Sequence, residues 1–197
     1  VDGDYNLAAK RAWQDHKENG TYLMGDYPYR GEGEKTIGFE LAEQINADKV
    51  IIPVGNGTLI HGIWKGYSEF KKVGLIDSKP HMIGVQADGC NTVVSALKKG
   101  YRRAKSVGNV DTVAGAIACA DPLDGDQALS SIRESDGFGL SVSDEKIMEA
   151  KEMLAEKEGI YAEEAGAAAM AGIIDNIDRF SSNETIVCLI TGHGLKT

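Results

Sequence analysis

The stretch KVIIPVGNGTLIHGIWKGY, residues 49–67, runs from a β-branched apolar segment through a glycine-bearing corner into an amphipathic pattern. The segment 49–54 lacks the strict alternation of a half-exposed strand, so it predicts a strand that is covered on both faces. Apolar residues then recur at helical spacing and predict a helix over 58–72: Ile60, Ile63, Trp64 and Tyr67. The corner Gly55–Thr58 therefore joins a strand to a helix.

The same succession of strands and helices continues along the chain. Two further apolar runs bounded by chain breakers predict strands at 81–87 and 185–191. Helical spacing predicts the remaining helices at 6–19, 34–45, 91–99, 126–134, 144–157 and 163–177. Strands that alternate with helices predict an α/β fold of three layers, α/β/α, around a mostly parallel sheet. With no long linker in its 197 residues, the chain is expected to form a single α/β domain over residues 1–197.

Composition excludes several classes of function. The formal net charge of −9 disfavours a nucleic-acid partner, because a phosphate backbone requires clustered Lys and Arg. No apolar run is long enough to cross a membrane, and the first residues lack the basic and apolar regions of a signal peptide. These features favour a cytoplasmic protein. Three widely spaced cysteines, Cys90, Cys119 and Cys188, predict reduced and buried thiols, and no metal site is expected.

Two glycine-containing corners stand where ligands bind in parallel sheets, at the carboxyl ends of strands. Gly55–Thr58 precedes a helix whose first N–H groups and dipole suit a phosphate, although a tight turn without a ligand would have the same sequence. It matches neither a dinucleotide fingerprint nor a Walker loop. Gly192-His193-Gly194 follows Thr191 at the end of the last apolar run.

Six stretches in collinear order resemble threonine synthase and its relatives among the fold type II pyridoxal-phosphate (PLP) enzymes. They cover nearly the whole chain: PYRGEGEKT (28–36), IIPVGNGT (51–58), DGDQALSSIRESDG (124–137), VSDEKIMEA (142–150), EGIYAEEAGAAAMAG (158–172) and TGHGLK (191–196). The resemblance implies a tryptophan synthase β-like large domain. It also implies PLP as cofactor and a small amino acid, either phosphorylated or unphosphorylated, as substrate.

The resemblance also implies roles for individual residues. The cofactor phosphate would be bound by one loop, Gly55, Asn56, Gly57, Thr58 and Leu59. Thr191 would face the pyridine nitrogen of the cofactor, and Arg30 would contact the phosphate of O-phosphohomoserine. Each residue also has an interpretation that involves no ligand. Arg30 could be a solvated charge, Thr191 a helix cap, and Glu163 an acid in the first turn of a helix, where the helix dipole favours it. His193 between two glycines fits a structural role as well as a catalytic one.

Three departures from the family pattern bear on function. The Schiff-base lysine of these enzymes, in a Ser-x-x-Lys stretch near the N-terminus, has no counterpart here, and Lys35 falls too late in the order to replace it. The chain therefore resembles the C-terminal, cofactor-phosphate-binding half of such an enzyme and is expected not to catalyse alone, so no catalytic residue is assigned. Met24–Tyr27 replaces a polar Asn-Ser pair, and Leu59 replaces an asparagine. Both changes would weaken binding of phosphohomoserine.

For the intact protein, these features predict a PLP-dependent carbon–oxygen lyase of the threonine synthase type, which converts O-phosphohomoserine and water to threonine and phosphate. One alternative is a threonine or serine dehydratase or a diamino-acid ammonia-lyase, which needs no site for a substrate phosphate. The other is a non-catalytic phosphate-binding module. Fold type II enzymes are often homodimers, so a homodimer is a further expectation.

Overall fold

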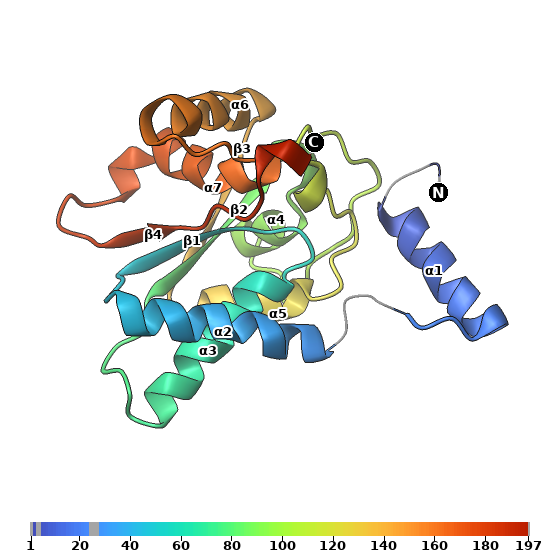
Figure 1. Cartoon of the computed structure of the whole chain (residues 1–197), viewed down its shortest axis with the longest axis horizontal. Helices are drawn as coiled ribbons and strands as arrows, with labels where there is room; N and C mark the ends of the chain where they lie inside the picture. Colours follow the sequence, from blue (N-terminus) through green and yellow to red (C-terminus); the bar gives the residue numbers. More distant parts are fainter. Residues whose placement is uncertain (1, 3–4, 24–27, 197) are drawn as a thin grey trace.

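A computed structural model describes residues 2, 5–23 and 28–196 of the chain. Within these residues the sheet has four parallel strands in the order β3-β2-β1-β4 (Figure 1). Their bounds are β1 Lys49–Pro53, β2 His81–Ala87, β3 Phe138–Val142 and β4 Ile186–Cys188. The predicted parallel sheet is confirmed.

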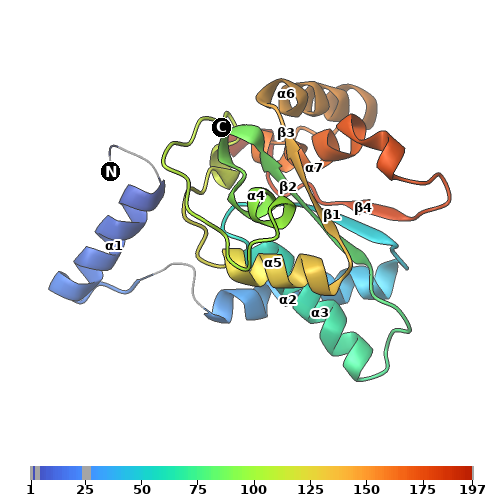
Figure 2. The ribbon, with the colours of Figure 1, turned by 180° about the vertical axis from the view of Figure 1, so that it is seen from behind.

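Helices cover both faces of the sheet, as the sequence predicts. One face carries α3 (Thr58–Lys72), α4 (Thr92–Lys98) and α5 (Gly125–Glu134), and the other carries α6 (Asp144–Met153) and α7 (Glu164–Asp175) (Figures 1 and 2). A π-helical turn, Leu154–Glu158, follows α6, and short 3-10 turns lie at Asp88–Cys90, Gly115–Ile117, Ile177–Arg179 and Gly194–Lys196. The three layers of the predicted α/β/α fold are therefore present.

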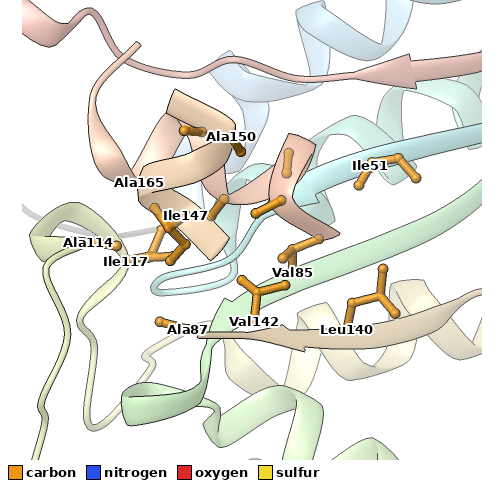
Figure 3. Packing of buried hydrophobic residues seen from close by; sticks show 14 of the residues in the cluster. Ile51, Val85, Ala87, Ala114, Ile117, Leu140, Val142, Ile147, Ala150 and Ala165 are labelled. Carbon is orange, nitrogen blue, oxygen red and sulfur yellow. The ribbon is translucent and has the colours of Figure 1, made fainter. Parts of the chain in front are cut away.

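Successive residues of β1 belong to different cores, because side chains along a strand point to opposite faces. Val50 and Ile52 pack with α3 and α5, whereas Ile51 packs with the α6–α7 layer. Figure 3 shows the second core, in which Val85 and Leu140 from the neighbouring strands face helix residues. All of these strand side chains are buried, which explains why β1 reads as a continuous apolar run.

Helix α2 (Pro28–Gln44) begins six residues before the start predicted at 34, so Arg30 lies on a helix and not in a loop. Gly31 and Gly33 made this segment resemble a loop in the sequence. Tertiary packing overrides that preference, because α2 lies directly against α3. Proline is well tolerated in the first turn of a helix, where its missing N–H leaves no bond unmade.

The strand predictions were incomplete at both edges of the sheet. Strand β3 was not predicted, because Gly139 and Ser141 interrupt its apolar residues. Glycine suits this position, because a Cβ atom would lie 2.9 Å from Leu97 Cδ1 and 3.0 Å from Val94 Cγ2 on α4. Strand β4 is only three residues long, shorter than the predicted 185–191, and it pairs with β1 alone.

Helix α1 (Tyr5–Asn19) stands apart from the layers in both views of the molecule (Figures 1 and 2). Its Leu7 and Trp13 side chains are 47% and 51% exposed. The stripe that predicted this helix is therefore not part of either core. Among the described residues, no helix combines the length and the apolar character needed to cross a bilayer.

The three cysteines carry free thiols. Cys90 and Cys119 are buried, as predicted, whereas Cys188 on the edge strand β4 is partly exposed. Loss of hydration raises the pKa of the Cys119 thiol to about 11 and that of Cys188 to about 12. These thiols therefore remain protonated at neutral pH, which makes them poor nucleophiles.

Candidate functional site

The corner between β1 and α3 is a rigid loop built around Gly57. This residue has a φ of +96°, and a Cβ atom on it would lie 2.7 Å from the carbonyl oxygen of Asp124. Gly55 is also confined, since its Cβ would lie 3.1 Å from the carbonyl oxygen of Ala116. Glycine at both positions lets the loop pack closely against two other segments.

Residues 119–124 form hydrogen bonds with the loop. Thr58 Oγ1 donates to Asp124 Oδ2 at 2.7 Å, and Asn56 Oδ1 accepts from Cys119 Sγ at 2.9 Å. The N–H of Asp124 donates to the carbonyl oxygen of Asn56 at 3.0 Å. The Thr58 hydroxyl proton is thus directed away from the loop, so Thr58 can contribute to a phosphate site mainly through its backbone N–H.

Thr191 lies after the end of β4 and lines the same cavity as the loop Gly55–Leu59. The chain there is clamped to the start of α7, because the N–H of Glu163 donates to the carbonyl oxygen of Gly192 at 2.9 Å. Ala162 and His193 form an antiparallel bridge beside it. His193 accepts from the N–H of Leu195 at 3.1 Å and packs edge-on against Tyr161, which favours the structural role for this histidine.

Arg30 reaches the cavity from the first turn of α2. Its Nε donates to Glu34 Oε1 at 2.9 Å, one helical turn further along. Burial raises the pKa of the Glu34 carboxyl, and the Arg30 charge opposes that rise. The Oε2 atom of Glu34 is buried without a hydrogen-bond partner among the described residues. The pair therefore combines an exposed cation with a half-buried acid.

One cavity, of about 260 Å³, brings all seven predicted site residues together: Arg30, Gly55, Asn56, Gly57, Thr58, Leu59 and Thr191. Its volume is near the lower end of the range for small-molecule sites. Pro53, Val54, Ile60, Ala116, Ile117, Glu163 and Ala165 complete the lining. Residues 24–27, which replace the family's polar pair, lie outside the described residues.

Sequence reasoning missed Asp124, Glu34 and the cavity-facing position of Glu163. The spacing of Arg30 and Glu34 would have indicated a pair if the segment had been interpreted as a helix. Asp124 gave no such signal, because its partner Thr58 is distant in the sequence. Glu163 carried only the signal of an acid at a helix start.

Comparison with known proteins identifies the family to which the chain belongs. The family model described as pyridoxal-phosphate dependent enzyme matches residues 1–192. Threonine synthase from Methanocaldococcus jannaschii is 42% identical over the whole of this chain and 50% of that protein. Threonine synthase from Methanosarcina acetivorans is 46% identical over 89% of this chain and 45% of that protein. The chain thus spans about half the length of these curated relatives.

Solved structures support the fold. Maize serine racemase matches with a TM-score of 0.80 at 19% identity, covering 98% of this chain and 58% of that one. Threonine deaminase isoform 2 from Solanum lycopersicum matches with a TM-score of 0.75 at 26% identity, covering 93% and 52%. The fold type II architecture follows from these likenesses. With its family model matched over residues 1–192, the chain belongs to the pyridoxal-phosphate dependent enzymes.

Proposed function

We propose that the protein containing this chain is a PLP-dependent lyase that converts O-phosphohomoserine and water to threonine and phosphate. The observation that carries this proposal is the single cavity that joins a glycine loop, a hydroxyl residue and an arginine: Gly55–Leu59, Thr191 and Arg30. Threonine synthases at 42% and 46% identity support the same reaction. The arginine supplies what that substrate requires beyond the cofactor, namely a cation for its phosphate.

The residues of the cavity fit a bound PLP. Its phosphate group matches the loop before α3, where a fifteen-residue helix presents its first N–H groups and the positive end of its dipole. The Asp124 carboxylate accepts the hydrogen bond of the Thr58 hydroxyl, so it is occupied by a group of the protein. Ala116 and Ile117 lie against Gly55 and add an apolar wall beside this end.

Each part of the chain then has a defined task. Bound PLP would supply an electron sink for the carbanion that forms next to the amino-acid nitrogen. The loop Gly55–Leu59 would hold the cofactor phosphate, and the Thr191 hydroxyl would form a hydrogen bond with the ring nitrogen. Arg30, oriented by Glu34, would bind the anionic group of the substrate. Among the described residues no lysine lines the cavity, so the proton-carrying amine is expected elsewhere in the intact protein.

A specific observation favours the second candidate, a threonine or serine dehydratase or a diamino-acid ammonia-lyase. Glu34 offsets part of the charge of Arg30, and Leu59 gives the cavity an apolar wall where an amide is expected for phosphohomoserine. Both features reduce the attraction for a substrate phosphate dianion. The threonine deaminase among the solved structures supports this candidate at the level of chemistry.

Product analysis on the longest natural form of the protein, loaded with PLP, separates the candidates. With O-phosphohomoserine, the lyase releases phosphate and threonine in equal amounts, and Arg30→Gln raises KM by about 10- to 100-fold, as for a lost charge-assisted contact. A dehydratase instead forms a 2-oxo acid and ammonia from threonine or serine. Absence of all of these products, together with no lysine labelled by PLP and borohydride, would leave the non-catalytic phosphate-binding module.

A further inference from the structure

Glu34 is an acid that stands next to the arginine assigned to the substrate. The two residues lie one turn apart on α2, a spacing that brings side chains together on one face of a helix. Arg30 Nε donates to Glu34 Oε1 at 2.9 Å, and 49% of the Arg30 side chain but only 18% of the Glu34 side chain is exposed. An anion that binds Arg30 from the cavity therefore meets a cation that already has a carboxylate partner.

Close packing against α3 fixes the Glu34 side chain at this position. A Cβ atom on Gly62 of α3 would lie 2.8 Å from the Cβ atom of Glu34, so the two helices are in close contact here. The Oε2 atom of Glu34 is buried and accepts no hydrogen bond from the residues that the structure describes. Burial without a hydrogen bond disfavours the ionised form, because a neutral carboxyl group loses less hydration than a carboxylate.

The charges around Glu34 act on it in opposite directions. Burial raises the pKa of its carboxyl, the Arg30 charge and hydrogen bond oppose that rise, and the Asp124 charge adds to it. The net direction is upward, so Glu34 takes up a proton more readily than an exposed glutamate does.

The other titratable side chains between α2 and α3 are engaged with different partners. His61 of α3 is directed toward α5, where its Nδ1 atom lies 3.2 Å from a serine hydroxyl, and burial lowers its pKa, which keeps it uncharged at neutral pH. Two lysines pair with the same two acids, Glu32 and Glu69: Lys35 from α2 and Lys65 from α3. The charge beside the arginine of α2 therefore depends mainly on the acid one turn further along.

Protonation of Glu34 changes the charge that an entering anion meets. While Glu34 is ionised, its charge offsets that of Arg30, and a dianion is attracted only weakly. Once Glu34 is protonated, the opposing charge is gone. By linkage, an anion that binds Arg30 favours proton uptake by Glu34 in return. The affinity for the anion thus falls as the pH rises through the pKa of Glu34.

We propose that Glu34 is a specificity-determining residue, whose carboxylate competes with the anionic group of the substrate for Arg30 and yields it when Glu34 takes up a proton. The proposal rests on the role of Arg30 in the proposed function. Repulsion by a carboxylate grows with the charge of the anion, so a phosphate dianion is disfavoured at high pH. A substrate with a neutral hydroxyl group in that place is unaffected.

The test measures sulfate binding by isothermal titration calorimetry, on the longest natural form of the protein loaded with PLP, from about pH 5 to about pH 9. Sulfate keeps its two charges over this range, so changes in affinity report groups of the protein. In the wild type, the dissociation constant is expected to rise by about tenfold with pH. Glu34→Gln keeps an oxygen for Arg30 Nε and removes the charge. It is expected to bind sulfate about tenfold more tightly than the wild type at the upper pH and to lose the pH dependence.

Two further variants serve as controls. Glu32→Gln removes the same charge from the same helix, but its exposed carboxylate pairs with Lys35 and Lys65. It is expected to leave the sulfate affinity and its pH dependence as in the wild type. Arg30→Gln is expected to weaken sulfate binding and to remove the pH dependence, which would place the ion at Arg30.

Enzyme kinetics provide a readout that a structural defect would not give. With O-phosphohomoserine at the upper pH, Glu34→Gln is expected to lower KM and to leave kcat unchanged, because it changes binding of the substrate anion and not the reacting atoms. A fall in kcat without a change in KM would contradict the proposal.

Equal sulfate affinities and pH profiles in the wild type and Glu34→Gln would overturn the role of Glu34 and leave the proposed reaction in place. The same shift in Glu32→Gln, or sulfate binding that Arg30→Gln does not weaken, would also overturn it. If Glu34→Gln fails to fold, Glu34→Asp replaces it, because the shorter side chain withdraws the carboxylate from Arg30. Sulfate binding no tighter than in the wild type would then count against Glu34.

Failure of the proposed reaction gives a different result. Sulfate binding needs no turnover, so a protein that shows the effect of Glu34 but forms no threonine would support this inference and contradict the proposed function.

Discussion

Gly57 shows at the scale of one residue why the loop sequence is so restricted. Its φ of +96° is a conformation that other residues adopt only with strain, and its Cα faces the backbone of Asp124. The phosphate loop is therefore shaped by contacts within the protein, before any ligand enters. Loop and backing segment form one unit, in which Asn56, Thr58 and Asp124 exchange hydrogen bonds.

Gly57→Ala tests this view of the loop. We expect it to lower the free energy of unfolding by more than about 2 kcal/mol, because strained backbone and a close backbone contact add together. Gly74→Ala is the matched control, since Gly74 also has a positive φ, +77°, but a Cβ there meets nothing within 4 Å. That change is expected to cost only about 1 kcal/mol. Urea unfolding measures both, and equal losses would contradict the account.

The sequence could predict those residues whose roles follow from local pattern. The run 49–54 and the glycines after it specify β1, the corner and α3 together, because burial and backbone freedom are both visible in residue types. Contacts between distant residues left no such pattern. Only the structure shows that Thr58 is hydrogen-bonded to Asp124. Only the structure shows that the Glu163 carboxylate lies against Gly192.

At the scale of elements, the pair α2 and α3 depends on close approach of the two backbones. A Cβ on Gly38 would lie 2.5 Å from the carbonyl oxygen of Ile63, and one on Gly66 would overlap the carbonyl oxygen of Lys35. The stacked rings of Phe39 and Phe70 pack beside this crossing. The crossing determines where the first turn of α2, and hence Arg30, lies relative to the loop at the start of α3.

Gly66→Ala is expected to destabilise the protein by about 1 to 3 kcal/mol through overpacking, against a gain of at most about 1 kcal/mol in helix propensity. Gly33→Ala on α2 is the control, because its Cβ would meet nothing within 4 Å and only the propensity gain remains. Thermal unfolding of both variants measures the two changes in stability. A stabilising Gly66→Ala would show that the helices can separate without cost.

The errors in element prediction share a physical cause. Glycines in α2 and β3 lower the local preference for helix and strand, and packing against α3 or α4 makes up for that loss. Such compensation is a property of the folded molecule and has no signature within a short window of sequence. Elements in which most residues are buried, such as β1 and α7, were predicted well because their composition directly reflects burial.

At the scale of the whole molecule, the fold gathers residues from both ends of the described chain at one edge of the sheet. Arg30 comes from α2, the loop from the β1–α3 corner, and Thr191 from the segment after β4. Parallel pairing of β1 with β4 places the last two features side by side, because both follow the carboxyl ends of their strands. The cavity is thus a consequence of sheet topology.

The most direct measurement is a crystal structure of the longest natural form of the protein grown with PLP. The account predicts the cofactor phosphate within hydrogen-bond distance of the backbone N–H groups of Gly55–Leu59, with the ring nitrogen at the Thr191 hydroxyl. A PLP phosphate bound at Arg30, or a ring turned away from Thr191, would contradict it.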